Sequence, residues 1–275
     1  MKLKGNLHRV GLYGFGIFWG FVIVVPVLFL ALLSLKSRLD AFAMPPKLFF
    51  TPTFEAYAAV LGDSAFIGAV QSSLIVSVGA VLLSLLVAIP AAYGLRNLSG
   101  PLRYNSMLAI LLIRMVPGMV YLLPFFIIYQ NLGLLDTHVG LILVHLVFNV
   151  PLIIWMLTPI WSSIPKDLSE AARIDGASPF QILWMVDLPL LKGGILASSI
   201  LAFIFSWNEF LFALILSRRE VVTLPVAIVS YLAYEGTEWA KVSAASMFII
   251  LPAIVFGFLV RRYMIAGVSG GAVKG

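Results

Sequence analysis

The chain contains a series of apolar runs, each long enough to cross a lipid bilayer. A spanning helix needs about 20 predominantly apolar residues. Runs of about this length cover residues 10–35, 66–95, 104–129, 139–160, 193–216 and 240–260. Only 11% of the 275 residues are charged, whereas about a quarter of the residues of a soluble domain are charged. The sequence therefore predicts an all-α integral membrane protein, with six transmembrane helices in a single domain over residues 1–275.

The fourth and fifth runs are separated by a polar elbow, residues 165–189. Helix-favouring residues lead to Asp175, and Gly176 follows as the residue best able to adopt the left-handed conformation that ends a helix. Ser178 and Gln181 then have the spacing of a capping box, with a proline at the first helical position between them. The pattern predicts a helix, a turn at the glycine and a second short helix.

The second elbow helix is expected to be amphipathic. Phe180, Leu183 and Trp184 have the spacing of one helical face, and Pro189 is expected to end the helix. The elbow is too polar to span a bilayer, yet one of its faces is apolar. We therefore expect another protein surface to dock on it, with an amphipathic helix lying on lipid headgroups as the alternative.

The distribution of basic residues predicts the orientation. Six spans place both termini on one side, together with the 96–103 turn and the elbow, and this side carries most of the Lys and Arg residues. Because cytoplasmic loops are enriched in Lys and Arg, the elbow and both termini are predicted to be cytoplasmic. The same rule explains the net charge of +6 without nucleic acid as a partner. Membrane lipid is expected to surround the chain.

The spacing of the elbow residues resembles the signature of bacterial ABC importer permeases. That signature is E-A-A, three residues, G, nine residues, I, one residue and L-P. It is matched here by Glu170-Ala171-Ala172, Gly176, Val186 in place of Ile, and Leu188-Pro189. Three further segments resemble carbohydrate-type permeases related to the shorter subunit of the maltose transporter. They are the run from Ser206 to Leu214, Thr223-Leu224-Pro225 and the ending Gly270 to Gly275.

The resemblance implies a subunit of a larger machine in a bacterial cytoplasmic (inner) membrane. The elbow would be a coupling helix that docks in a groove of an ATP-binding subunit dimer, through Glu170, Ala171, Ala172, Asp175 and Gly176. A second homologous permease and an extracytoplasmic solute-binding protein would complete the assembly. ATP and Mg²⁺ would bind the partner ATPase, with no cofactor in this chain. The substrate, a carbohydrate or sugar derivative, would pass by alternating access.

Ionisable residues inside spans are functional candidates, because burying a charge in a membrane is costly. Arg114 lies near the midplane of the third span, and Pro117 and Gly118 predict a break in the helix just after it. Arg114 is expected either to bind a substrate oxygen or anionic group, or to form a structural pair. Asn208 and Glu209 on the fifth span fit packing, gating or substrate contact, and Glu209 is a candidate partner for Arg114.

Two weaker groups of pathway candidates follow. Asn149, and His145 one turn earlier, fit a helix-bonding role or a place in the pathway. Tyr121, Tyr129 and Gln130 lie toward the outer end of the third span, where aromatic residues meet sugar rings or anchor a helix at the interface.

No enzyme or metal site is predicted. Gly267 to Gly271 fits G-x-S-x-G but lacks the strand–turn–helix context of a nucleophile elbow. No Walker A sequence and no Cys/His metal cluster is present, so ATP hydrolysis is assigned to a partner. The alternatives are a permease for a polyol, glycerol-phosphate or other small polar solute, and a stand-alone secondary transporter. Arg114 favours a substrate with an acidic group.

Overall fold

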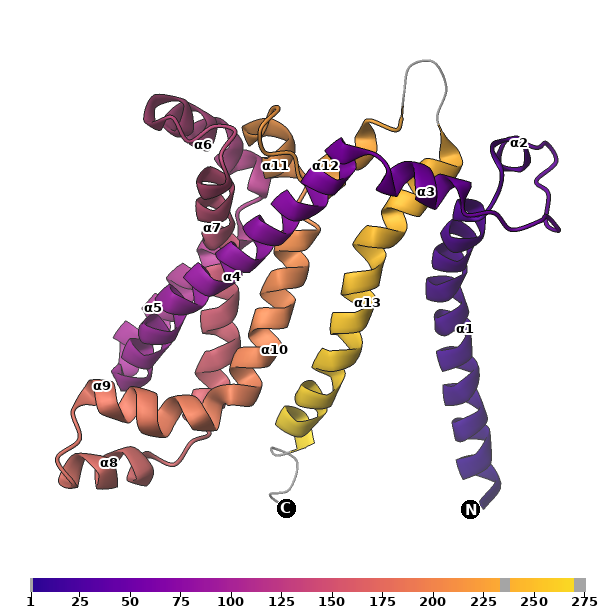
Figure 1. The fold of residues 1–275 in the computed structure, drawn as a ribbon. Coiled ribbons are helices and arrows are strands. Elements are labelled where there is room, and N and C mark those ends of the chain that lie inside the picture. The colour runs from indigo at the N-terminus through magenta and orange to yellow at the C-terminus, as the bar shows by residue number, and fades with distance from the viewer. Residues whose placement is uncertain (1, 233–237, 270–275) are drawn as a thin grey trace. The chain divides into compact units, whose positions relative to one another are not determined.

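The computed structural model describes residues 2–232 and 238–269, with side chains described for 11–165, 167–232 and 238–259. The described backbone consists of helices and connecting loops, without a strand (Figure 1). It forms two compact units where the sequence indicates no boundary. Unit 1 combines Met1–Ile67 with Ala227–Ile250, and unit 2 combines Gly68–Val226 with Leu251–Gly275. Two long helices, α4 (Ser64–Asn97) and α13 (Trp239–Ser269), contribute to both.

Within the described residues, five helices are long and apolar enough to cross a membrane. They are Gly11–Ser34, Ser64–Asn97, His138–Ser162, Pro179–Trp207 and Trp239–Leu259. A further pair, α5 (Gly100–Met115) and α6 (Gly118–Leu132), passes the same test jointly but is bent by 85°. The bend falls at the residues where the sequence predicts a break, so that prediction is confirmed.

Unit 1 contains α1 (Lys2–Ser34), α2 (Arg38–Ala41) and α3 (Glu55–Leu61). The apolar side chains of α1 are mostly exposed, as expected for a helix that faces lipid. The hydroxyl oxygens of Ser34 and Tyr57 lie 2.8 Å apart, which ties the end of α1 to α3. Phe66 is buried and packs edge-on against Phe248 of α13, with ring centroids 5.4 Å apart. This small core joins α1, α3 and the first part of α13.

Unit 2 is built around α7 (His138–Ser162), which packs against α5 and α10 (Leu188–Trp207). Small residues allow the close approach of α7 and α10. A Cβ on Gly194 would lie 2.7 Å from Cδ1 of Ile160, so only glycine fits without a shift of that side chain. The buried core comprises Val81, Ala88, Ala92, Leu95, Ile153, Ile154, Leu157, Trp161, Leu183, Leu191 and Ala202.

The opposite end of unit 2 carries the short helix α11 (Leu211–Leu216) and the first residues of α12 (Leu224–Val229), whose remainder belongs to unit 1. α11 packs against α6 and α7. In the loop before α7, Asp136 has a left-handed backbone with a φ of 57°. Its carboxylate accepts hydrogen bonds from the backbone N–H groups of residues 218–221, at 2.8–3.1 Å. One side chain thereby holds the whole turn that follows α11.

The elbow comprises α8 (Lys166–Ile174), α9 (Pro179–Gln181) and a π-helical segment, η1 (Ile182–Asp187). Gly176 has a φ of 86°, which confirms its predicted left-handed conformation. The predicted capping box is also confirmed. The backbone N–H of Gln181 donates to Ser178 Oγ at 3.3 Å, and the Ser178 N–H donates to the Gln181 side-chain oxygen at 2.8 Å.

Two expected helix ends differ in the structure. Pro189 does not end the second elbow helix: it directly follows the π-helical segment η1, and the helix continues through it as α10. A continuous helix therefore runs from Pro179 to Trp207. The run expected as one span over residues 193–216 is interrupted after Trp207, and α11 is a separate helix beyond the break.

Candidate functional site

The predicted coupling residues lie on the surface of the elbow. α8 and α9 lie at one end of unit 2, and α6 and α11 at the other (Figure 1). Glu170, Ala171, Asp175 and Gly176 are exposed, and Ala172 is partly buried. Ile174 is 87% exposed although it is apolar. The structure thus gathers these residues on one outward-facing, short helix and its capping turn.

The apolar face expected on the second elbow helix is divided between two environments. Phe180 and Trp184 are 69% and 55% exposed, with their ring centroids 5.9 Å apart. Leu183, expected beside them, is buried in the core of unit 2. The difference arises because residues 182–187 form a π-helix, whose wider turns change the direction of successive side chains. The exposed aromatic pair adds to the surface open to a partner.

A buried ion pair lies behind α8. Nη1 of Arg96, in the last turn of α4, lies 3.0 and 2.9 Å from Oδ1 and Oδ2 of Asp187, the last residue of η1. Ser169 of α8 joins them. Its Oγ accepts a hydrogen bond from Arg96 at 3.3 Å and donates one to Asp187 at 3.4 Å. Three elements therefore meet at one polar cluster.

The sequence reasoning did not identify this cluster. Asp187 is the only acidic residue in the apolar run from Ile182 to Leu191, and an isolated acid in such a run indicates a buried partner. That signal was available. The identity of the partner was not, because Arg96 lies in a short polar turn ninety-one residues away and looks like an ordinary basic loop residue.

Arg114 ends α5, just before the bend to α6. Its guanidinium donates to the backbone carbonyl oxygen of Phe148 on α7 at 3.4 Å. The guanidinium carbon also lies 5.3 Å from the centroid of the Phe205 ring on α10, within the range of a cation–π interaction. Among the described residues, Arg114 takes part in no ion pair.

The proposed pairing of Arg114 with Glu209 is not present. Glu209 lies in the break after α10, and its two carboxylate oxygens accept hydrogen bonds from the N–H groups of Phe212 and Ala213 at 2.8 and 3.1 Å. Its Oε2 also lies 3.7 Å from Nε2 of His145. The carboxylate therefore caps the start of α11 and faces α7, because the chain leaves the helix before Glu209 and turns it away from Arg114.

The remaining pathway candidates are placed along the same helices. Asn149 is fully buried and its amide donates to Ser206 Oγ at 2.8 Å, which joins α7 to α10. The Tyr121 hydroxyl donates to the Ile113 carbonyl oxygen at 2.8 Å and so braces the bend between α5 and α6. Asn208 is exposed, and its amide bonds to the Ile204 carbonyl oxygen within its own helix.

The structure thus brings together the end of α5, the helices α7 and α10, and the break that follows α10. Arg114 contacts α7 and α10, Asn149 bonds to α10, and His145 approaches Glu209. Ser206 and Phe205 were not identified from the sequence, since a serine and a phenylalanine in an apolar span carry no distinctive signal. Asn208 does not join this group.

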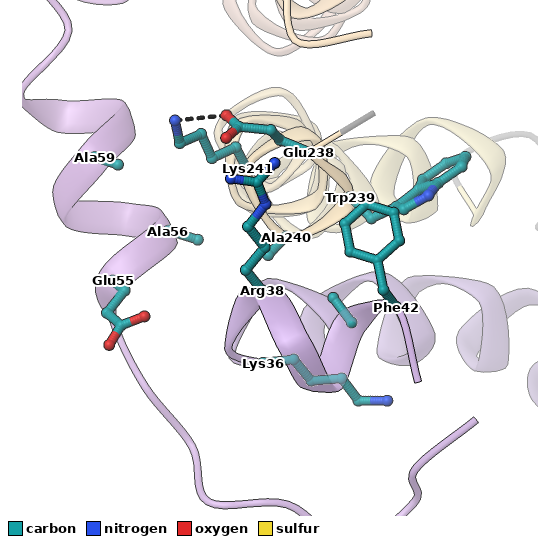
Figure 2. Close-up of a pocket in the computed structure, with 11 residues that line it drawn as sticks. Lys36, Arg38, Phe42, Glu55, Ala56, Ala59, Glu238, Trp239, Ala240 and Lys241 are labelled. Atoms are coloured by element: carbon teal, nitrogen blue, oxygen red, sulfur yellow. Dashed lines mark ion pairs between the residues drawn. The ribbon is translucent and has the colours of Figure 1, made fainter. Parts of the chain in front are cut away.

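Unit 1 contains a separate cavity of about 160 Å³. Figure 2 shows Phe42 and Trp239 at this cavity, with Arg38 directed toward an ion pair between Lys241 and Glu238. Nζ of Lys241 and Oε2 of Glu238 lie 2.5 Å apart. None of the predicted pathway residues lines it. In the part of the chain that the structure describes, no three His, Cys, Asp or Glu residues are grouped as metal ligands would be. The ending 270–275, which contributed to the resemblance, lies outside the described residues.

The fold and these sites define a multi-pass helical membrane protein with an exposed helical elbow between two long apolar helices. Residues 80–266 match the family described as binding-protein-dependent transport system inner membrane component, and the chain belongs to this family. The resemblance found in the elbow is thereby confirmed.

Individual relatives agree over almost the full length. The chain is 36% identical to the trehalose transport system permease protein SugB of Mycobacterium tuberculosis, covering 92% of this chain and 93% of the relative. It is 30% identical to the diacetylchitobiose uptake system permease protein DasC of Streptomyces coelicolor, covering 92% of each. A crystal structure of a bacterial ABC transporter that imports the acidic polysaccharide alginate matches with a TM-score of 0.75 and 27% identity. It covers 95% of this chain and 96% of the matched chain.

Proposed function

We propose that this chain is the membrane-spanning permease subunit of an ATP-driven, binding-protein-dependent importer for a carbohydrate or sugar derivative. The family supports the permease role. The carbohydrate class is supported by relatives whose names refer to trehalose and diacetylchitobiose, and by the likeness to the alginate importer. The chain itself would not hydrolyse ATP. ATP and Mg²⁺ would bind the ATP-binding subunits.

The observation that carries the coupling role is the exposure of α8. A helix with acidic and basic side chains, an 87% exposed isoleucine and a neighbouring exposed aromatic pair has a free surface suited to a partner. We therefore assign Glu170, Ala171, Ala172, Asp175 and Gly176 to docking on an ATP-binding subunit dimer. The elbow and both termini would be cytoplasmic, in agreement with the excess of basic residues on that side.

A second homologous permease and an extracytoplasmic solute-binding protein complete the proposed assembly. The substrate would pass beside the bend between α5 and α6, where Arg114, Tyr121, Asn149 and Glu209 lie on converging helices. Asn208 is retained as a pathway candidate on the exposed side of α10. Broken helices near a binding site are a recurrent feature of transporters, and the bend after Arg114 fits this pattern.

The test is reconstitution of the permease pair with its ATP-binding subunits in liposomes. Uptake is then measured with the solute-binding protein and labelled disaccharides, oligosaccharides, acidic sugars, polyols and glycerol-phosphate. ATP-dependent uptake of one of the sugars is the expected result. Uptake by this chain alone, without ATP, would show a secondary transporter, and uptake of glycerol-phosphate or a polyol alone would replace the carbohydrate assignment.

Arg114→Ala separates the two roles proposed for Arg114. A variant that assembles normally but loses uptake of acidic sugars selectively would assign the guanidinium to the substrate. If uptake of every transported solute is unchanged, the contacts with Phe148 and Phe205 are structural.

A further inference from the structure

The coupling helix is loosely held by the rest of unit 2. From Asp167 to Ile174, no side chain of α8 is buried, and only Ser169 and Ala172 are partly buried. Among the helices, η1 is the main packing partner of α8. A cavity of about 220 Å³ opens between α8 and the end of α4, with Tyr93, Asn97 and Arg173 among its lining residues. A helix held in this way has room to move as a rigid body.

A polar contact connects α8 to two of the long helices. Ser169 and Arg96 both line the cavity, and Ser169 accepts a hydrogen bond from Arg96 and donates one to Asp187. Arg96 belongs to the last turn of α4, and Asp187 is the residue at which η1 becomes α10. The cluster therefore links the exposed helix to two long apolar helices at once.

Burial makes this connection specific. The side chains of Arg96 and Asp187 are only 8% and 0% exposed. An ion in such a place is strongly disfavoured without its partner, so the two helices are held at the separation that keeps the pair intact. The π-helical turn orients Asp187 inward, and π-helical segments are frequent at functional sites. Because η1 and α10 form one continuous helix, a displacement at Asp187 turns the whole of α10.

We propose that Arg96, Asp187 and Ser169 form the joint through which movement of α8 is transmitted to α4 and α10. This inference rests on the proposed function, in which α8 docks on the ATP-binding subunits. Arg96 and Asp187 are then positioning residues. They contact neither substrate nor nucleotide, and they make α4 and α10 move together with the docked α8. The structural alternative is a pair that serves only folding.

The experiment compares reconstituted complexes that contain the wild-type chain, Asp187→Asn, or the double variant R96M/D187L. The double variant replaces both charges with apolar side chains, which preserves packing without a buried lone ion, and removes the bonds to Ser169. The matched control is Asp40→Asn, which breaks the exposed Lys47–Asp40 pair, whose N–O distance is 2.7 Å. Four quantities are measured for the wild-type complex and for each variant. They are assembly, basal ATP hydrolysis, stimulation of hydrolysis by the solute-loaded binding protein, and the amount of solute moved per ATP.

The joint predicts that the double variant assembles and keeps basal hydrolysis, while stimulation and solute moved per ATP fall about tenfold, the scale of an ordinary coupling free energy. Asp187→Asn shows the same loss wherever it assembles, and Asp40→Asn behaves as wild type. Wild-type coupling in the double variant would overturn the proposal. So would failure of both variants to assemble, which would make the pair a folding element alone. If the wild-type complex itself shows no stimulated hydrolysis, the proposed function fails and not merely the joint.

Discussion

An aspartate carboxylate organises each end of unit 2, but the two carboxylates accept hydrogen bonds from different kinds of donor. At one end, the carboxylate of Asp136 accepts four backbone N–H groups from consecutive residues of the turn after α11. At the elbow end, the carboxylate of Asp187 is held by one guanidinium nitrogen and one serine hydroxyl, both from other helices. The first arrangement joins two loops through backbone donors, and the second joins separate helices through side-chain donors.

The difference indicates which end is suited to move. The four donors to Asp136 are backbone N–H groups whose directions the turn fixes, so together they hold the two loops in one geometry. The donors to Asp187 belong to side chains on α4 and α8, and side chains can follow a helix that shifts. A moving coupling helix and a fixed loop at the other end are consistent with the proposed rigid-body transmission.

Removing Arg96 is expected to have the largest effect on stability. Arg96→Ala leaves Asp187 buried without a counter-charge, and should cost about 3–5 kcal/mol of unfolding free energy. R96M/D187L should recover most of this loss. Denaturant unfolding of the purified chain in detergent measures both. A loss for Arg96→Ala close to zero would show that Asp187 finds another donor or reaches water.

At the Asp136 end of unit 2, even one added methyl group should destabilise the fold. A Cβ on Gly140, near the start of α7, would overlap the carbonyl oxygen of Leu134, which belongs to the backbone and cannot rotate away. Gly140→Ala is expected to cost about 2–3 kcal/mol through overpacking. The control is Gly194→Ala, whose methyl meets side-chain atoms of Ile160 and Leu157 and no backbone atom, and should cost less. The two variants are compared by thermal unfolding. A lower unfolding temperature for Gly194→Ala than for Gly140→Ala would contradict this expectation.

A substitution at Gly176 probes the elbow end of unit 2. A φ of 86° is unfavourable for any residue with a branched Cβ, and nothing else lies within 4 Å of the position. Gly176→Val should therefore cost about 1–2 kcal/mol of backbone strain, with a local change in the α8 turn. Because this turn positions the docking face, solute uptake per ATP should fall more than stability does. Uptake at the wild-type ratio would remove Gly176 from the coupling residues.

The smallest expected effect is the pH dependence of the Asp136 loop, which lies between α6 and α7. Burial alone would raise the pKa of Asp136, but the four backbone N–H donors outweigh it and lower the pKa from 3.8 to about 2. The lowered pKa means that the charged form stabilises the folded loop above pH 3.8, and that this contribution is lost as pH falls through about 2.

The measurement is the difference in the free energy of unfolding between wild type and Asp136→Asn. It should be constant from pH 7 to pH 5, at about 1 kcal/mol, the net value of an ordinary hydrogen bond, and should shrink toward pH 2. A difference that is independent of pH down to 2 would show that the charge of Asp136 is not what holds the turn.

Local features of the fold could be predicted from the sequence because their causes are local. The left-handed Gly176, the capping box of Ser178 and Gln181, and the break after Arg114 each depend on a few adjacent residues. The family could be identified for the same reason, since its signature lies within one short elbow.

Features that depend on packing could not be predicted in this way. Pro189 suggests a helix end, yet the core contacts of Leu183 and Leu191 on either side favour one continuous helix. The pairing of Glu209 with Arg114, one of the alternatives considered for Arg114, does not occur, because the chain leaves its helix at Asn208 and Glu209 caps α11 instead. The joint between Arg96 and Asp187 depends on the arrangement of three helices, which no local pattern specifies.

The π-helical segment also sets the angular phase of the elbow. A π-helical turn contains one residue more than an α-helical turn, so deletion of one residue between Ile182 and Asp187 would let this segment close as an α-helix and would redirect the side chains within it. The burial of Leu183 and Asp187 beside the exposed Trp184 depends on this extra residue. The length of this segment, and not only its composition, therefore determines which way the permease presents its elbow to a partner.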